Sequence, residues 1–142
     1  MTLASILRSK GGSLVSVEAD TPVAAVTEIL HRNNIGAVLV MRGGQLAGVL
    51  SDRGIVRAMA LNPQGVRAMP AERAMRPREH EATPDMPLTE AMRIMTVHRV
   101  RYLPVLDDGT LVGIVSIGDL LKAELERQSV AVDSLTAYIG GT

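Results

Sequence analysis

The chain has 142 residues, 46% of them hydrophobic, which suits one compact unit or two small repeats with an aliphatic core and excludes wholesale disorder. Lysine and arginine number 15, and so do aspartate and glutamate, so the net charge is zero and the basic excess of a dedicated nucleic-acid binder is missing. Without cysteine, the chain has no disulfide framework, cysteine-ligated zinc or cysteine nucleophile, and 1% of aromatic residues is too little for a base-stacking platform.

The N-terminal segment, residues 1–12, lacks the basic start and the long apolar run of a secretory signal peptide. No stretch of the chain approaches the ~18 consecutive apolar residues that span a bilayer as a helix. We therefore expect a cytoplasmic protein whose partners include neither a membrane nor a nucleic acid.

The next segment, residues 13–61, predicts a helix, a hairpin and a second helix. Thr21-Pro22 is typical of a helix start, because threonine caps helices and proline suits the first helical position. Two short apolar runs, 35–40 and 46–50, flank a glycine-containing turn and predict a buried β-hairpin. Ser51 then opens the second helix.

The rest of the chain divides into a linker, a second set of elements and a tail. Residues 62–79 are interpreted as a linker with one short helix, stopped by Pro77. Residues 80–126 repeat the order of elements of the first segment. Residues 127–142 continue as a helical tail whose apolar residues recur at steps of three and four. This apolar seam packs either on the flank of its own chain or on a second subunit.

The second half of the chain matches the first without a gap. The shift that places Asp20 on Asp85 also places residues 35–51 on residues 100–116, with apolar and turn residues in register. Several matches in one register indicate an internal duplication, and a duplicated unit of this size predicts two similar substructures.

The hairpins of both copies end in the same motif. Each ends in Gly-x-x-Ser, and Ser116-Ile117-Gly118-Asp119 matches the Ser/Thr-x-x-Asp signature of CBS domains. Duplicated over residues 12–126, the unit resembles a tandem CBS pair, or Bateman module, of the stand-alone bacterial type. The resemblance implies an α+β fold in which two βαββα repeats pack with pseudo-two-fold symmetry, followed by a C-terminal helix. It also implies that the protein senses an adenosine nucleotide and is not an enzyme.

Ser116 and Asp119 lie where an apolar strand gives way to a helix, a place where free backbone N–H groups favour an anion. A carboxylate there can accept hydrogen bonds from both hydroxyl groups of a ribose, as acids do in other nucleotide-binding folds. The same pair also fits a capping box, in which capping stabilises the helix by ~1 kcal/mol without any ligand. The residues leave both interpretations open, and the resemblance favours the nucleotide.

The resemblance implies a cleft that combines the signature of the second repeat with a strand edge of the first. The nucleotide-binding residues expected there are Lys10, Gly12, Ser13, Ile35, Gly36, Ala37, Arg101, Ser116 and Asp119. The expected ligand is AMP, ADP, ATP or NAD(H). The alternatives are a solvated surface role for Lys10 and a surface salt bridge for Arg101.

The opposite cleft is expected to use Ser51, His80 and Tyr102, again with Arg101. Its motif, Ser51-x-x-Gly54, has glycine where the signature has the acid. We therefore expect this cleft to bind more weakly, to be empty, or to hold the far end of a dinucleotide. An acid restored at position 54 should strengthen its binding if the glycine is not needed for close packing.

Catalytic and metal-binding patterns are missing from the sequence. His31, His80 and His98 form no metal-ligand spacing. Gly113-x-x-x-x-Gly118 begins like a P-loop but is followed by Asp119, which would repel a phosphate, instead of by lysine. We expect no enzyme activity, no catalytic cofactor and no metal site.

Two functions remain. In the first, a regulatory module binds an adenosine ligand, senses nucleotide state and signals in trans to an unknown protein partner. In the second, a constitutive dimeric interaction module works without a ligand. We expect a homodimer, held together by the tail and by apolar side chains of the helices, among them Val26, Leu30, Met92 and Met95.

Overall fold

The structure, a computed structural model, describes the backbone of residues 1–11 and 14–139 and the side chains of these residues up to 129. The first half of the chain forms β1 (Ser16–Glu18), α2 (Val23–Asn33), β2 (Ala37–Arg42), β3 (Gln45–Ser51) and α3 (Asp52–Leu61). The second half forms α5 (Leu88–His98), β5 (Tyr102–Asp107), β6 (Thr110–Ser116) and α6 (Ile117–Ile139). The segments that precede the two halves hold α1 (Leu3–Lys10), the 3₁₀ turn η1 (Val66–Ala68), α4 (Ala71–Ala74) and β4 (Arg76–Pro77).

The order of helix, hairpin and helix expected from the sequence is confirmed in both halves. The helical spacing of Val23, Val26 and Leu30 places all three on the buried side of α2. The hairpin strands β2 and β5 each bury four consecutive residues, because they are covered on both faces.

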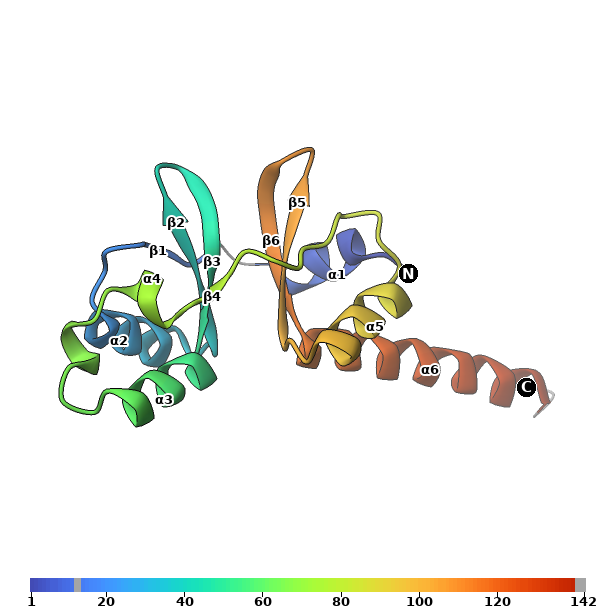
Figure 1. The fold of residues 1–142 in the computed structure, drawn as a ribbon. Helices are drawn as coiled ribbons and strands as arrows, with labels where there is room; N and C mark the ends of the chain where they lie inside the picture. Colours follow the sequence, from blue (N-terminus) through green and yellow to red (C-terminus); the bar gives the residue numbers. More distant parts are fainter. Residues whose placement is uncertain (12–13, 140–142) are drawn as a thin grey trace.

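The two halves form two sheets of the same design (Figure 1). In the first, β1 runs parallel to β2, and β2, β3 and β4 follow antiparallel to one another. In the second, β5 and β6 form an antiparallel hairpin, and Ala82 bridges Val105 in parallel as Val17 pairs with Val40 in the first. Both hairpins carry a register irregularity immediately after the equivalent residues Val40 and Val105. The expected pseudo-two-fold symmetry is therefore present in the two hairpins and in the parallel pairing beside each, whereas the second sheet, as described, has no counterpart of β4.

Each half is completed by a segment that precedes the other half in the chain. The helix α1 lies ahead of the first half, yet Leu3 and Ile6 belong to the core of the second. The helix α4 lies ahead of the second half, yet Ala71 and Ala74 belong to the core of the first. Figure 1 shows α1 beside β5 and β6, and α4 beside α2. The two halves are interlocked by this exchange of segments.

A third apolar cluster joins the two hairpins. Leu39 and Leu46 of the first hairpin meet Leu106 of the second, and none of the three is more than 6% exposed. The hairpins therefore stand side by side (Figure 1), which holds the ends of β3 and β6 close to the opposite half.

Three of the four helix residues expected at a subunit contact lie instead in the chain's own core. Val26, Leu30 and Met95 are buried, and Met92 packs against the same core as Met95. The expectation is wrong for the three buried residues, because α2 and α5 turn their apolar sides inward, whereas Met92 is only partly buried and its role at a contact stays a prediction. Large exposed apolar side chains are found on α3 and α6, namely Val56, Met59, Leu61, Leu121 and Leu125.

The C-terminal helix is confirmed as a single element, α6, which extends to Ile139. The members of its apolar seam beyond residue 129 lie outside the described side chains. Within the described part of the chain, no helix has the length and the apolar character needed to cross a membrane.

Candidate functional site

A cavity of about 410 Å³ lies between the two halves, and we call it the Asp119 cleft. One wall comes from α1, the end of β6 and the start of α6, and the other from the residues that lead into β2. It brings together these residues expected from the sequence: Lys10, Ile35, Gly36, Ala37, Ser116 and Asp119. Gly12 and Ser13 lie outside the described residues, and Arg101 lines the opposite cavity.

Ser116 and Asp119 form a reciprocal capping box at the start of α6. The Asp119 N–H donates to Ser116 Oγ at 3.0 Å, and the Ser116 N–H donates to Asp119 Oδ2 at 2.8 Å. No donor among the described residues bonds to the second carboxylate oxygen, Oδ1. The capping role is therefore present, and it leaves one carboxylate oxygen available to a ligand.

Lys10, the last residue of α1, fixes the same carboxylate from the other side. Its ammonium Nζ donates to Asp119 Oδ2 at 2.9 Å and to the Ile114 carbonyl at 3.0 Å. Burial would raise the pKa of Asp119, but the hydrogen bonds from Ser116 and Lys10, with the charge of Lys10, hold it below its ordinary value. Asp119 is therefore a carboxylate anion at neutral pH, and Lys10 is a cation inside the cleft.

The opposite wall of the Asp119 cleft is mainly apolar. Ile35, Gly36 and Ala37 form it, and a Cβ on Gly36 would overlap the Tyr102 hydroxyl. Tyr102 thus covers the backbone at Gly36 and also lines the opposite cavity. Burial, and after it the nearby carboxylate of Asp52, raises the pKa of Tyr102, so this side chain is a neutral phenol.

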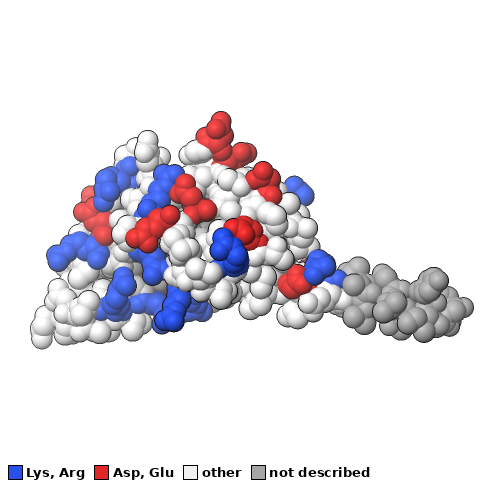
Figure 2. Space-filling model, turned by 45° about the vertical axis from the view of Figure 1, so that its right-hand side comes forward, with Lys and Arg blue, Asp and Glu red and all other residues white. Residues whose placement is uncertain are grey.

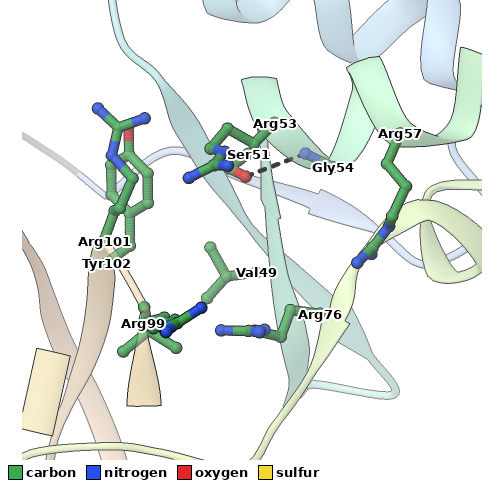
Figure 3. Close-up of a pocket in the computed structure, with 10 residues that line it drawn as sticks. Val49, Ser51, Arg53, Gly54, Arg57, Arg76, Arg99, Arg101 and Tyr102 are labelled. Carbon is green, nitrogen blue, oxygen red and sulfur yellow. Dashed lines mark hydrogen bonds between the residues drawn. The ribbon is translucent and has the colours of Figure 1, made fainter. Parts of the chain in front are cut away.

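The opposite cavity, of about 300 Å³, is lined by Ser51, Gly54, Tyr102 and five arginines, and we call it the arginine cleft (Figure 3). The five are Arg53, Arg57, Arg76, Arg99 and Arg101. Ser51 is the N-cap of α3, because its Oγ accepts the Gly54 N–H at 3.3 Å. Ser51, Tyr102 and Arg101 were expected here, whereas Arg53, Arg57 and Arg76 were not.

Gly54 stands at a close contact between α3 and α4. A Cβ at this position would lie 3.0 Å from the Ala74 carbonyl oxygen and 3.2 Å from a Leu50 methyl carbon. A side chain at position 54 would therefore be tight, and Ala74 and Leu50 would have to shift by a few tenths of an ångström to admit it. The effect of restoring the acid there stays a prediction.

His80 lies in a small adjoining cavity of about 30 Å³ with Arg76 and Tyr102, not in the arginine cleft itself. Its ring stacks on that of His98, with 3.9 Å between ring centroids. Among the described residues, no three histidine, aspartate or glutamate side chains are grouped so that they could hold a metal ion together.

Sequence reasoning missed most of the arginine cleft because its arginines come from separate elements. Arg53 and Arg57 lie on α3, Arg76 on β4, and Arg99 and Arg101 between α5 and β5. For the three arginines that were missed, the local signal was the pair Arg53 and Arg57, which are spaced to share a helix face just after the Ser51 cap.

Comparison with known proteins places this fold in a family. The family model of the CBS domain matches the chain twice, over residues 6–61 and 71–126. The chain is 29% identical to the CBS domain-containing protein YhcV of Bacillus subtilis, over 89% of this chain and 90% of the relative.

Solved structures agree. A CBS-domain containing protein from Agrobacterium tumefaciens is 31% identical, with a TM-score of 0.83 over 87% of this chain and 99% of that chain. A CBS domain protein from Pyrobaculum aerophilum complexed with AMP shares the fold at 24% identity, with a TM-score of 0.74 over 84% of this chain and 89% of that chain. With the family model matched in both halves and the duplicated fold present, this chain belongs to the CBS domain family, as a tandem pair of CBS domains.

Proposed function

We propose that this chain is a regulatory module that binds AMP, ADP, ATP or NAD(H) in the Asp119 cleft and signals the bound state in trans to a protein partner. The observation that carries the proposal is the anionic Asp119 carboxylate, which lines the cleft and has one oxygen without a donor among the described residues. Such an oxygen suits the hydroxyl groups of a ribose. The AMP complexed with the Pyrobaculum protein supports AMP as the first ligand to test.

The remaining parts of a nucleoside phosphate also find suitable chemistry in the cleft. Ile35 and Ala37 offer an aliphatic wall to an adenine, and the Lys10 ammonium offers a cation to a phosphate. The two walls belong to different repeats, so a ligand that touches both stabilises one relative arrangement of the repeats over others. A ligand shifts such an equilibrium only through its different affinity for the two arrangements.

Calorimetric titration tests this function directly. AMP, ATP and NADH are titrated into the full chain, and 2′,3′-dideoxy-AMP serves as the matched control that lacks only the two ribose hydroxyls. We expect the dideoxy analogue to bind about tenfold or more weakly, because charge-assisted hydrogen bonds to Asp119 are lost. Equal affinity for AMP and the analogue would contradict the ribose contact. Since the chain is proposed to sense and not to convert its ligand, we also expect chromatography to return the nucleotides unchanged.

A dimeric interaction module without a ligand is the second candidate function. It is favoured by the exposed apolar side chains of α3 and α6, which resemble an uncovered contact surface. No change in melting temperature with any adenine nucleotide, together with a stable dimer, would select this function over the first, because a ligand that binds only the native state raises its stability.

A further inference from the structure

The arginine cleft concentrates positive charge in a chain whose net charge is zero. Its five guanidinium groups come from α3, β4 and the residues around the start of β5, and they surround one cavity (Figure 3). Figure 3 shows the Arg76 and Arg99 side chains extending toward one another. In Figure 2, lysine and arginine side chains gather over the lower part of the first repeat, at the left of the view. The charge is thus gathered at one place by the fold, although no run of the sequence shows it.

None of these five arginines has an acidic partner among the described residues, whereas four arginines elsewhere in the chain do. Arg42, Arg78, Arg93 and Arg127 each form an ion pair with a glutamate. Within the described residues, none of the five guanidinium groups of the arginine cleft forms an ion pair, and no acidic residue lines the cavity. Like charges around one cavity repel each other, and a bound anion would relieve that repulsion.

Arg99 also occupies a backbone conformation that arginine does not favour. It ends α5 with a φ of 53°, in the left-handed region, where glycine and asparagine are the usual residues. The equivalent residue at the end of α2 is Asn34, with a φ of 52°. An unfavourable residue at a strained position is expected where its side chain has a task, and the side chain of Arg99 lines the arginine cleft.

The same cleft lacks what a nucleoside needs. Gly54 stands where the signature has the acid that would accept ribose hydroxyls, and a side chain there would be tight against α4. A guanidinium group forms two parallel N–H···O bonds with a phosphate, and five guanidinium groups around one cavity suit an anion with more than one phosphate.

We propose that the arginine cleft binds a phosphoanhydride chain, and that it recognises the phosphates without a nucleoside. The ligand class comprises inorganic triphosphate, pyrophosphate and the polyphosphate end of a nucleotide. This site is separate from the Asp119 cleft and goes beyond the nucleoside binding proposed there.

Calorimetry with inorganic triphosphate is the test. We expect affinity to rise from orthophosphate to pyrophosphate to triphosphate, because each added phosphate engages further guanidinium groups. Arg76→Gln and Arg99→Gln should each weaken triphosphate binding about tenfold or more. Arg93→Gln, which removes an exposed arginine on α5 outside the cleft, is the matched control and should bind as the wild type does. All the replaced side chains are exposed, so the variants should fold, and circular dichroism checks this.

Two further experiments distinguish which kind of phosphate ligand the arginine cleft binds. Asp119→Asn should leave triphosphate binding unchanged, which keeps this result independent of the function proposed for the Asp119 cleft. ATP should bind the arginine cleft no more tightly than triphosphate does once the Asp119 variant is used. The proposal is overturned if triphosphate does not bind at millimolar concentration, if Arg76→Gln and Arg99→Gln bind it as the wild type does, or if ATP binds and triphosphate does not. A single-stranded oligonucleotide that displaces triphosphate at lower phosphate concentration would also overturn it, in favour of a nucleic-acid surface.

Discussion

Asp119 uses one of its two carboxylate oxygens within the chain and keeps the other available. Oδ2 accepts the Ser116 N–H and the Lys10 ammonium, which together hold the side chain in one orientation. A helix cap and a ligand contact are therefore compatible roles for this residue. Its orientation is fixed before a ligand arrives, so little conformational entropy remains to be lost on binding.

Replacing Asp119 by asparagine separates the charge from the cap. The asparagine keeps an oxygen that can accept the Ser116 N–H, but it loses the charge that strengthens bonds from ribose hydroxyls. We expect the affinity for AMP to fall roughly ten- to hundred-fold, from a loss of ~1.5–3 kcal/mol. The melting temperature at neutral pH should fall modestly, because the ion pair with Lys10 is lost while the cap is kept. Calorimetry and thermal melts of Asp119→Asn measure both, with Asp85→Asn as a control outside both clefts. A large loss of stability with unchanged affinity would show that Asp119 is only a cap.

The same residue predicts how stability depends on pH. The pKa of Asp119 in the folded chain lies below its ordinary value of 3.8. The ionised carboxylate therefore stabilises the fold fully when the pH is above the ordinary pKa. This stabilisation is lost as the pH falls through the lower pKa of the folded chain. We expect the melting temperature of the wild type to fall more steeply than that of Asp119→Asn below about pH 4. An equal fall of the melting temperature with pH in the wild type and in Asp119→Asn would show that the ion pair with Lys10 adds nothing to stability.

At the scale of elements, the exchange of α1 and α4 makes each repeat depend on a segment outside it. Leu3 is fully buried in the core of the second repeat, although it precedes the first. Leu3→Ala should therefore lower the free energy of unfolding by ~2–5 kcal/mol, because it leaves a cavity in that core. Denaturant melts measure this, with Val97→Ala, at a side chain that is 59% exposed, as the control. A loss no larger than that of Val97→Ala would mean that α1 is dispensable to the fold.

The contact of α3 with α4 gives a further prediction. Gly54→Asp should destabilise the chain and should not create nucleotide binding in the arginine cleft, because the added Cβ would lie 3.0 Å from the Ala74 carbonyl. Gly54→Ala is the matched variant that adds the Cβ without the acid. Melting temperatures and AMP titrations of both variants test this. Tighter AMP binding by Gly54→Asp at unchanged stability would contradict this prediction, because it would show that α4 moves aside at little cost in free energy.

Local patterns predict the elements well, because helical spacing and the alternation of apolar runs with turns are properties of adjacent residues. The spacing of Val23, Val26 and Leu30 is enough to define α2. The strands β1 and β4, of three and two residues, are too short to carry any pattern. Which core a short helix such as α1 joins depends on tertiary packing, and no local signal states it.

The two candidate clefts differ in how far the sequence predicts them. The Asp119 cleft follows from one contiguous motif and one strand edge, so the family resemblance points to its residues. The arginine cleft assembles side chains from elements far apart in the chain, and nothing near Arg76 in the sequence indicates that it lines the same cavity as Arg99. Charge gathered by folding is invisible to composition, which gives only a neutral total.

At the scale of the whole molecule, the two clefts are chemically unequal and share one side chain. The Asp119 cleft pairs one carboxylate with one ammonium, whereas the arginine cleft has five guanidinium groups and no acid among its lining residues. Tyr102 lines both. A ligand that moves Tyr102 in one cleft therefore changes the shape of the other, which gives the pair of repeats a direct route for communication.

The exposed apolar side chains of α3 and α6 predict a homodimer. Val56 and Leu125 are 67% and 65% exposed, and the internal duplication places Val56 and Leu121 at equivalent positions, so the two helices present similar apolar surfaces. Two copies that meet through these helices would remove both surfaces from water, and a two-fold contact is the commonest closure of an oligomer. We expect sedimentation to show a dimer at low micromolar concentration. The double variant Val56→Glu and Leu125→Glu should dissociate it, while Val97→Glu, at an exposed residue of α5, should not. A wild-type chain that sediments at 15.1 kDa would contradict the dimer.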